Sequence, residues 1–157
     1  MILAAVGDTH GKVDTIIREL KPLTLNYLVF TGDYYTDGKK IARELKVPLL
    51  GVNGNCDYRN RGNAEKTVDI EGSKFLIVHG HQYGVKGSLN RLFYYGQELQ
   101  VNMVVFGHTH IAYCEMVEGM WLFNPGSPTY PRIGTGSYGV INVEKGSLQP
   151  VILQLAR

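Results

Sequence analysis

The chain has 157 residues, of which 44% are hydrophobic and 19% are charged, and this length and composition predict a single globular domain over residues 1–157. The formal net charge is only +2 and no block of lysine or arginine occurs, which argues against a nucleic-acid-binding protein. The two cysteines exclude a disulfide framework, and no apolar run approaches the roughly 20 residues that a bilayer requires, so we expect a cytoplasmic protein that does not enter membranes.

Short apolar runs that end in polar turns alternate with helical patterns in the first third of the chain. We expect strand, helix, strand, helix and strand, in that order, at residues 2–6, 13–20, 27–30, 38–45 and 48–52. Alternation of this kind is typical of parallel strands whose faces are covered by helices.

The remainder of the chain adds antiparallel hairpins to this pattern. Its expected elements are paired strands at 66–70 and 74–78, a helix at 87–99, a strand at 102–106, paired strands at 112–117 and 120–123, and final strands at 138–143 and 151–155. Together the elements predict an α/β fold, a four-layer αββα sandwich of two mixed sheets flanked by helices.

Glycine is frequent, with 19 residues in the chain, and it lies beside polar residues at five predicted strand ends. The polar side chains of these five turns are Asp8, His10, Asp33, Asn55, His79, His81, His108 and His110. One such residue in one turn is usually a local cap or turn former. All five histidines of the chain fall in these turns, however, and ligands of open α/β sheets bind at the carboxyl ends of strands, so the pattern indicates one shared site.

Imidazole, carboxylate and amide oxygen together form a mixed nitrogen and oxygen ligand set. Such a set favours Mn²⁺, Fe²⁺, Co²⁺, Ni²⁺ or Zn²⁺ over Ca²⁺ or Mg²⁺, which prefer oxygen alone. Seven ligands exceed the needs of one tetrahedral site and suit two ions that share a carboxylate. Centres of two metal ions activate water and hold the reacting oxygens in phosphoester hydrolysis. We therefore expect two divalent transition-metal ions, with Mn²⁺ first among them.

The ordered motifs resemble those of a known family, the calcineurin-like metallophosphoesterases. The motifs are Asp8-x-His10, Gly32-Asp33, Gly54-Asn55-Cys56-Asp57, His79-Gly80-His81 and Gly107-His108-Thr109-His110. Each is short, but all five in this order are specific. The compact length, Cys56, Asn124-Pro125-Gly126-Ser127 and Pro131-Arg132 resemble the small bacterial and archaeal phosphodiesterase subgroup of that family.

The resemblance implies a role for each matching residue. It assigns one ion to Asp8, His10 and His110, a second ion to Asn55, His79 and His108, and a bridging position to Asp33. A hydroxide between the ions would attack phosphorus in line, and a small phosphodiester is the expected substrate. The predicted catalytic residues are Asp33, Asn55, Asp57 and His81.

Cys56 departs from the pattern of many larger members, which carry histidine there as the proposed proton donor to the leaving group. Asp57, Cys56 and His81 are the candidate replacements, and for Cys56 we favour a packing role over a catalytic one. His81 is also a candidate for orienting a ligand. Asn124 and Ser127 are expected to form turns.

Substrate contacts are expected from residues outside the metal ligands. Arg59, Arg61 and Arg132 are candidate phosphate contacts, and the loops at 34–38 and 58–63, with help from 83–96, are expected to determine specificity. The chain has ten tyrosines, which suit either aromatic stacking or a subunit interface in a homo-oligomer.

Two other functions compete with the hydrolase. A non-catalytic scaffold is one, because the vacuolar-sorting scaffold of the retromer coat resembles this family and has lost part of its metal-binding set. The complete ligand set of this chain argues against that interpretation. A nuclease is the other, but this chain has neither spare length for a further domain nor a basic stripe.

Overall fold

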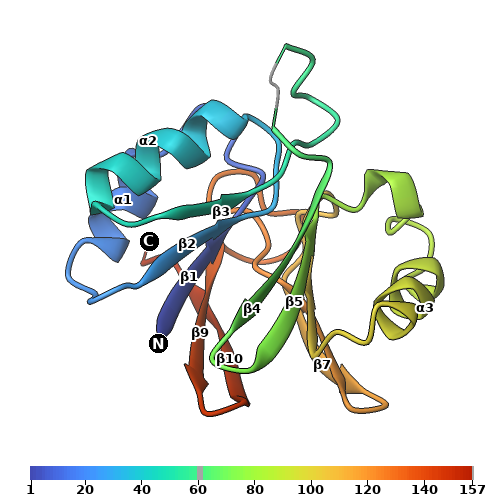
Figure 1. Cartoon of the computed structure of the whole chain (residues 1–157). Helices are drawn as coiled ribbons and strands as arrows, with labels where there is room; N and C mark the ends of the chain where they lie inside the picture. The colour runs from blue at the N-terminus through green and yellow to red at the C-terminus, as the bar shows by residue number, and fades with distance from the viewer. Residues whose placement is uncertain (60–61, 157) are drawn as a thin grey trace.

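Two facing β-sheets with helices on their outer faces make up the computed structural model, which describes residues 1–59 and 62–156 (Figure 1). In spatial order, the strands of the first sheet are β10 (Ser147–Gln154), β9 (Ser137–Glu144), β1 (Ile2–Val6), β2 (Tyr27–Phe30) and β3 (Leu49–Gly51). Those of the second are β4 (Glu65–Ile70), β5 (Ser73–Val78), β6 (Met103–Val105), β8 (Met120–Asn124) and β7 (Tyr113–Val117). The helices are α1 (Asp14–Leu20), α2 (Tyr35–Leu45) and α3 (Asn90–Glu98), with a 3₁₀ turn at His81–Tyr83. Across the described residues, none of the helices is long and apolar enough to cross a bilayer.

Both sheets combine parallel and antiparallel strands. Strands β1, β2 and β3 run parallel, as do β5, β6 and β8. Strand β9 pairs antiparallel with β1 and β10, while β4 and β7 run antiparallel to their neighbours at the edges of the second sheet. The expectation of two mixed sheets is confirmed. The parallel strands within each sheet end at the same sheet edge, which brings the turns that follow them together.

Three apolar layers explain why the strands and helices stack as four layers. Side chains such as Leu3, Val29 and Phe75 point from both sheets into the space between them. On the outer face of the first sheet, the next residues along the strands pack against α1 and α2, and on the outer face of the second sheet they pack against α3 (Figure 1). Successive strand residues face opposite sides, so each strand contributes to two layers. Burial of each large apolar side chain stabilises the fold by about 1.5–3 kcal/mol.

The observed elements differ from the predicted ones mainly at their ends. Helix α2 begins at Tyr35 instead of residue 38, because Tyr34 takes a left-handed φ of 64° and its carbonyl accepts the backbone N–H of Asp37. Helix α3 is shorter than the predicted 87–99. Strand β10 begins at Ser147 instead of residue 151 and continues through Pro150. An edge strand tolerates proline because the missing N–H faces away from the ladder.

Candidate metal centre

The five polar turns meet where the carboxyl ends of the two sheets face each other. In the first sheet, the backbone N–H of Asp8 donates to the carbonyl of Gly32 at 3.0 Å. In the second, the N–H of Gly107 donates to the carbonyl of His79 at 2.9 Å. The backbone N–H of His108 then donates to Oδ2 of Asp8 at 2.9 Å, and this bond joins the two sheets at the site.

Four of the predicted ligands form one compact group. Asp8, His10, Asp33 and His110 each offer an atom, and these atoms all lie within 4.8 Å of one another. Nε2 of His10 lies 3.3 Å from Nε2 of His110, which lies 3.6 Å from Oδ1 of Asp8. Two nitrogens bound to one ion at about 2.0–2.1 Å would be separated by roughly 3–3.4 Å, so the spacing of these imidazoles suits a shared metal ion.

The remaining predicted ligands form a second group beside the first. Nε2 of His79 lies 2.9 Å from Oδ1 of Asn55 and 3.1 Å from Nδ1 of His108. Asp33 faces both groups: Oδ1 lies 3.4 Å from Nε2 of His79, and Oδ2 lies 3.7 Å from Nε2 of His10. The structure therefore brings all seven predicted ligands together, with Asp33 between the two groups.

Second hydrogen bonds orient the imidazoles toward the centre. Nδ1 of His79 lies 2.8 Å from the carbonyl of Thr31, and Nδ1 of His110 lies 2.8 Å from the carbonyl of Tyr130. A carbonyl can only accept, so each Nδ1 carries the proton and each Nε2 presents its lone pair to the centre. This is the arrangement that a metal-binding histidine needs.

The electrostatics of the centre favour a cation. Asp8 is fully buried, and burial followed by the charge of Asp33 raises the pKa of the Asp8 carboxyl well above its usual value. Oδ1 of Asp8 has no hydrogen-bond partner among the described residues. Burial is also the first cause that lowers the pKa values of His79, His110 and His108, the last to about 4. Neutral imidazoles beside buried, mutually repelling carboxylates fit divalent metal ions, which supply the missing positive charge.

Backbone strain is concentrated in the same turns. Non-glycine residues with φ between 47° and 69° include five of the seven predicted ligands, namely Asp8, His10, Asp33, His108 and His110. Left-handed backbone at non-glycine positions costs of order 1–3 kcal/mol each, and it persists where the surrounding structure fixes it, often at functional sites. The strained turns therefore support the assignment of these residues to a functional centre.

Three buried side chains outside the ligand set hold the turns in place. Asp37 accepts hydrogen bonds from Oγ1 of Thr9 and the N–H of Gly11, both at 2.7 Å, and so closes the first turn. Nδ2 of Asn124 donates to the carbonyl of Gly107 at 3.1 Å. Ser127 donates to the carbonyl of Asp8 at 2.8 Å, and Asn124 and Ser127 thus help to hold the turns, as predicted. The role of Asp37 was not predicted, because an aspartate near a helix start normally indicates a cap.

Asp57 lies near the centre with both carboxylate oxygens occupied. Oδ1 accepts the backbone N–H of Tyr35 and Oδ2 that of Gly54, each at 2.7 Å. Two such bonds stabilise the charged carboxylate. They favour a role in holding the loop around Asn55 over the predicted role as a proton donor, which stays a prediction.

His81 and Cys56 differ in how well the structure fits their predicted roles. The ring of His81 lies 5.3 Å from that of His79, and its buried Nδ1 has no hydrogen-bond partner within the described part of the chain, so it stays a candidate for orienting a ligand. Cys56 is only partly buried, and its side chain lines a pocket beside the centre. Cys56 is therefore not fully buried, and its packing role stays a prediction.

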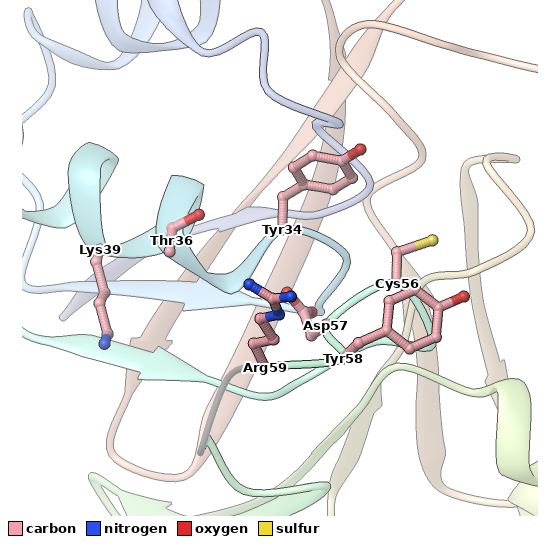
Figure 2. A pocket seen from close by; sticks show the side chains of 7 residues that line it. All are labelled: Tyr34, Thr36, Lys39, Cys56, Asp57, Tyr58 and Arg59. Atoms are coloured by element: carbon pink, nitrogen blue, oxygen red, sulfur yellow. The ribbon is translucent and has the colours of Figure 1, made fainter.

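The pocket beside Cys56 has a volume of about 460 Å³ and lies between the start of α2 and the loop after β3 (Figure 2). Arg59 is part of its lining, and its predicted contact with phosphate stays a prediction. Arg132 lies on a different pocket, of about 210 Å³, and its backbone N–H donates to the carbonyl of His110. The third predicted contact, Arg61, lies outside the described residues.

A two-sheet α/β sandwich with grouped carboxylates and imidazoles defines a protein with a candidate centre for divalent metal ions. Residues 1–146 match the model of the calcineurin-like phosphoesterase superfamily domain. The chain therefore belongs to the calcineurin-like phosphoesterase superfamily, and the resemblance of its motifs is confirmed.

Similar proteins agree with this family. The probable metallophosphoesterase YsnB of Bacillus subtilis (strain 168) is 31% identical over 147 residues, which cover 92% of this chain and 85% of that protein. The phosphodiesterase YfcE of Escherichia coli (strain K12) is 26% identical over 189 aligned positions, which cover 99% and 98% of the two chains.

Solved structures with the same fold include a predicted phosphoesterase and Vps29. A predicted phosphoesterase from Streptococcus pneumoniae TIGR4 superposes with a TM-score of 0.83 at 18% identity, over 98% of this chain and 88% of that one. Vps29 of Entamoeba histolytica, complexed with Zn²⁺, superposes with a TM-score of 0.80 at 22% identity, over 99% and 100% of the two chains. At these identities the structures establish the fold alone.

Proposed function

We propose that the protein is a phosphodiesterase that hydrolyses a small phosphodiester with two divalent transition-metal ions. The observation that carries the proposal is the position of Asp33. One of its oxygens faces His10 at 3.7 Å and the other faces His79 at 3.4 Å, so a single carboxylate is placed to serve both ligand groups. The similarity to the phosphodiesterase YfcE supports the same activity.

The ligand groups suggest which residues hold each ion. Asp8, His10 and His110 would hold one ion and Asn55, His79 and His108 the other, with Asp33 bound to both. When bound, such ions would lower the pKa of water toward about 7, so that hydroxide would be available to attack phosphorus at neutral pH, and they would offset charge on the phosphoryl oxygens. The mixed ligand set favours Mn²⁺ and also accommodates Ni²⁺, Co²⁺, Fe²⁺ or Zn²⁺.

The preference for a diester over a monoester rests on the similarity to the phosphodiesterase YfcE. Asp8 and Asp33 would offset only two of the four positive charges of two divalent ions, so the charge of the centre accommodates either ester. In this proposal Asn55, which lies beside His79, would contact the phosphoryl group, and His81, whose ring is 5.3 Å from that of His79, would help to orient it.

Metal analysis and an assay with bis(p-nitrophenyl) phosphate test the proposal. We expect the purified protein to bind about two transition-metal ions per chain, to lose hydrolysis on prolonged chelation, and to regain it with Mn²⁺, Ni²⁺ or Co²⁺. The matched variants are Asp33→Asn, which should weaken binding of both ions, and the exposed Asp14→Asn, which should bind and hydrolyse like the parent. Full activity in a verified metal-free sample would sink the proposal. Metal binding with no hydrolysis of any ester would point instead to the scaffold.

A further inference from the structure

The pocket lined by Cys56 and Arg59 lies beside the proposed metal centre, and two of its lining residues contact proposed ligands. Tyr34 follows Asp33 in the chain, and its ring centroid lies 5.2 Å from that of His10. The backbone N–H of Cys56 donates to Oδ1 of Asp33 at 2.9 Å. In Figure 2, Cys56 and Tyr58 lie at one end of the pocket and Lys39 lies at the other. A group attached to phosphorus at the centre can therefore extend along the protein surface into this pocket.

The charge of the pocket is positive where a substrate would lie. The guanidinium of Arg59 forms no hydrogen bond or ion pair with any of the described residues, and Figure 2 shows it in the middle of the pocket lining, between Lys39 and Tyr58. Asp57 also lines the pocket, but its oxygens accept backbone N–H groups and its single negative charge is outnumbered by the two cations Arg59 and Lys39. Lys39 adds a second cation, and Thr36 lies in the first turn of α2, where the helix dipole also favours an anion.

The aromatic side chains give the pocket a second property. Tyr34 is 42% exposed and Tyr58 is 90% exposed, and both line the pocket, so their rings are accessible to a ligand. Tyr34 also has a φ of 64°, a strained conformation for a bulky residue, which turns its ring toward His10 and the pocket. A volume of about 460 Å³ lies within the range of roughly 300–1,000 Å³ that small-molecule sites occupy.

We propose that this pocket binds the leaving group of the substrate and that the leaving group is itself a phosphomonoester of nucleotide type. The substrate class is then a phosphoric anhydride that joins two organic phosphates, and the inference rests on the proposed function. Arg59 and Lys39 bind the departing phosphate, and the rings of Tyr34 and Tyr58 pack against its aromatic part. Arginine forms paired hydrogen bonds with phosphate oxygens, which suits it to this position.

The chemistry of the lining favours an anhydride over an alkyl diester. An alkoxide leaving group needs a proton as it departs, and Arg59 supplies charge but no proton because its guanidinium stays protonated. A departing phosphomonoester needs none, since its oxygen is stable as an anion. The oxygen of water bonds to phosphorus, the bond from phosphorus to the bridging oxygen breaks, and the bridging oxygen keeps the electron pair. The two protons of the attacking water pass to the two phosphomonoester products, which release most of these protons to solvent at neutral pH.

Three substrates and a set of variants test the inference with the Mn²⁺-loaded full chain. The substrates are diadenosine pyrophosphate, the ordinary dinucleoside phosphodiester ApA, and bis(p-nitrophenyl) phosphate, which lacks a second phosphate. We expect kcat/KM to be at least about 100-fold higher for the pyrophosphate than for ApA. Arg59→Ala should lower kcat/KM for the pyrophosphate by roughly tenfold or more and that for bis(p-nitrophenyl) phosphate by less than about twofold.

Matched variants locate the effect in the pocket. Arg59→Lys should recover part of the loss, because it restores the charge without the paired hydrogen bonds. Lys40→Ala is the control for Lys39→Ala, since Lys40 lies on the same helix but pairs with the exposed Asp14 at 3.4 Å. Lys39→Ala should slow the pyrophosphate reaction and Lys40→Ala should not.

Binding of the product gives a readout that does not depend on turnover. Calorimetry on the chelated protein should detect adenosine monophosphate, with much weaker binding of adenosine, and Arg59→Ala should weaken the former by roughly tenfold. The inference is overturned if adenosine binds as well as its monophosphate, or if Arg59→Ala slows all three substrates equally. Metal-dependent hydrolysis of bis(p-nitrophenyl) phosphate would still stand in that case, which separates failure of the pocket from failure of the proposed function.

Discussion

The hydroxyl of Ser127 donates a hydrogen bond to the backbone carbonyl of Asp8 at 2.8 Å, across 119 residues of sequence. The same oxygen accepts the backbone N–H groups of Thr129 and Tyr130, and the carbonyl of Tyr130 in turn accepts Nδ1 of His110. The buried Ser127 thus connects the turn that carries Asp8 to the segment whose carbonyl orients the imidazole of His110. Positions of metal ligands in this fold depend on such contacts as much as on the ligands themselves.

Ser127→Ala should destabilise the protein and weaken metal binding without removing a ligand. The variant leaves the buried carbonyl of Asp8 and two partly buried N–H groups without their partner, and the buried group alone costs about 1–3 kcal/mol. Urea unfolding of the chelated protein and calorimetric titration with Mn²⁺ measure the two effects. Ser147→Ala, at an exposed position of β10, is the control and should change neither. Unchanged metal affinity in Ser127→Ala would show that the serine only stabilises the fold.

Gly32→Ala should be more damaging than alanine at another glycine with the same backbone conformation. Gly32 has a φ of +99°, and a Cβ there would lie 2.7 Å from the backbone nitrogen of Gly54 and 2.9 Å from Nδ1 of His79. Gly72→Ala is the matched control, because its φ is +78° and nothing lies within 4 Å of the added carbon. Both variants pay the left-handed penalty of about 1–2 kcal/mol. Only Gly32→Ala should also lower metal affinity, and equal losses in the two variants would refute the steric argument.

Cys56→His should make hydrolysis less dependent on the acidity of the leaving group. The thiol of Cys56 lines the proposed leaving-group pocket, and burial followed by the charge of Asp33 raises its pKa to about 11, so it stays protonated and is a weak acid. Imidazole at this position supplies a better proton donor, and general acid catalysis is typically worth about 10²–10⁴-fold. The measurement is kcat/KM over a series of aryl diesters whose phenols differ in pKa.

Two further observations decide what the thiol does. Cys56→Ala should behave like the parent if the thiol only lines the pocket. If kcat/KM depends little on the phenol pKa in the parent but strongly in Cys56→Ala, the thiol is itself the proton donor. We expect kcat/KM of the parent to fall steeply as the phenol pKa rises, and we expect Cys56→His to reduce this dependence.

Much of the centre could be predicted from sequence because the ends of strands determine where the residues that follow them lie. Asp8, Asp33 and His79 each follow a short apolar run, and parallel strands bring such residues to one sheet edge. The ligand types then indicate the kind of metal. What the strand pattern does not contain is the path of each turn, so the left-handed backbone of Asp8 and Asp33 was not predicted.

The roles of residues in loops depended on contacts that are distant in sequence. Asp37 closes the turn of Thr9 through a 2.7 Å bond across 28 residues, and no local pattern indicates that partner. Cys56 was expected to pack in the interior because a free cysteine usually does. Its neighbour Asn55 instead faces His79, and this orientation of the loop leaves the thiol on the pocket.

Asp8→Asn should stabilise the metal-free protein at neutral pH and destabilise the metal-loaded one. The amide keeps an acceptor for the N–H of His108, and its Nδ2 would lie near the lone pair of His110, whose Nε2 is 3.6 Å from Oδ1 of Asp8. It also removes one of two buried like charges, the second cause after burial of the raised pKa of Asp8. In chelated protein at pH 7, the melting temperature should therefore rise by at least about 2–4 °C, the shift expected for 1 kcal/mol in a chain of this size.

The pH dependence of the gain in melting temperature follows from the raised pKa of Asp8 in the folded protein. Because the pKa of Asp8 is raised in the folded state, ionisation costs stability once the pH exceeds the unfolded value of about 3.9, and the cost is complete above the folded value. The advantage of Asp8→Asn should therefore shrink as the pH falls and vanish near pH 4. With Mn²⁺ the order should reverse, because the variant loses a charged ligand and with it the stabilisation that binding provides. Scanning calorimetry of both proteins, with and without chelator, measures this crossover. A variant that melts below the parent by the same amount with and without chelator would show that Asp8 serves the fold and not the metal.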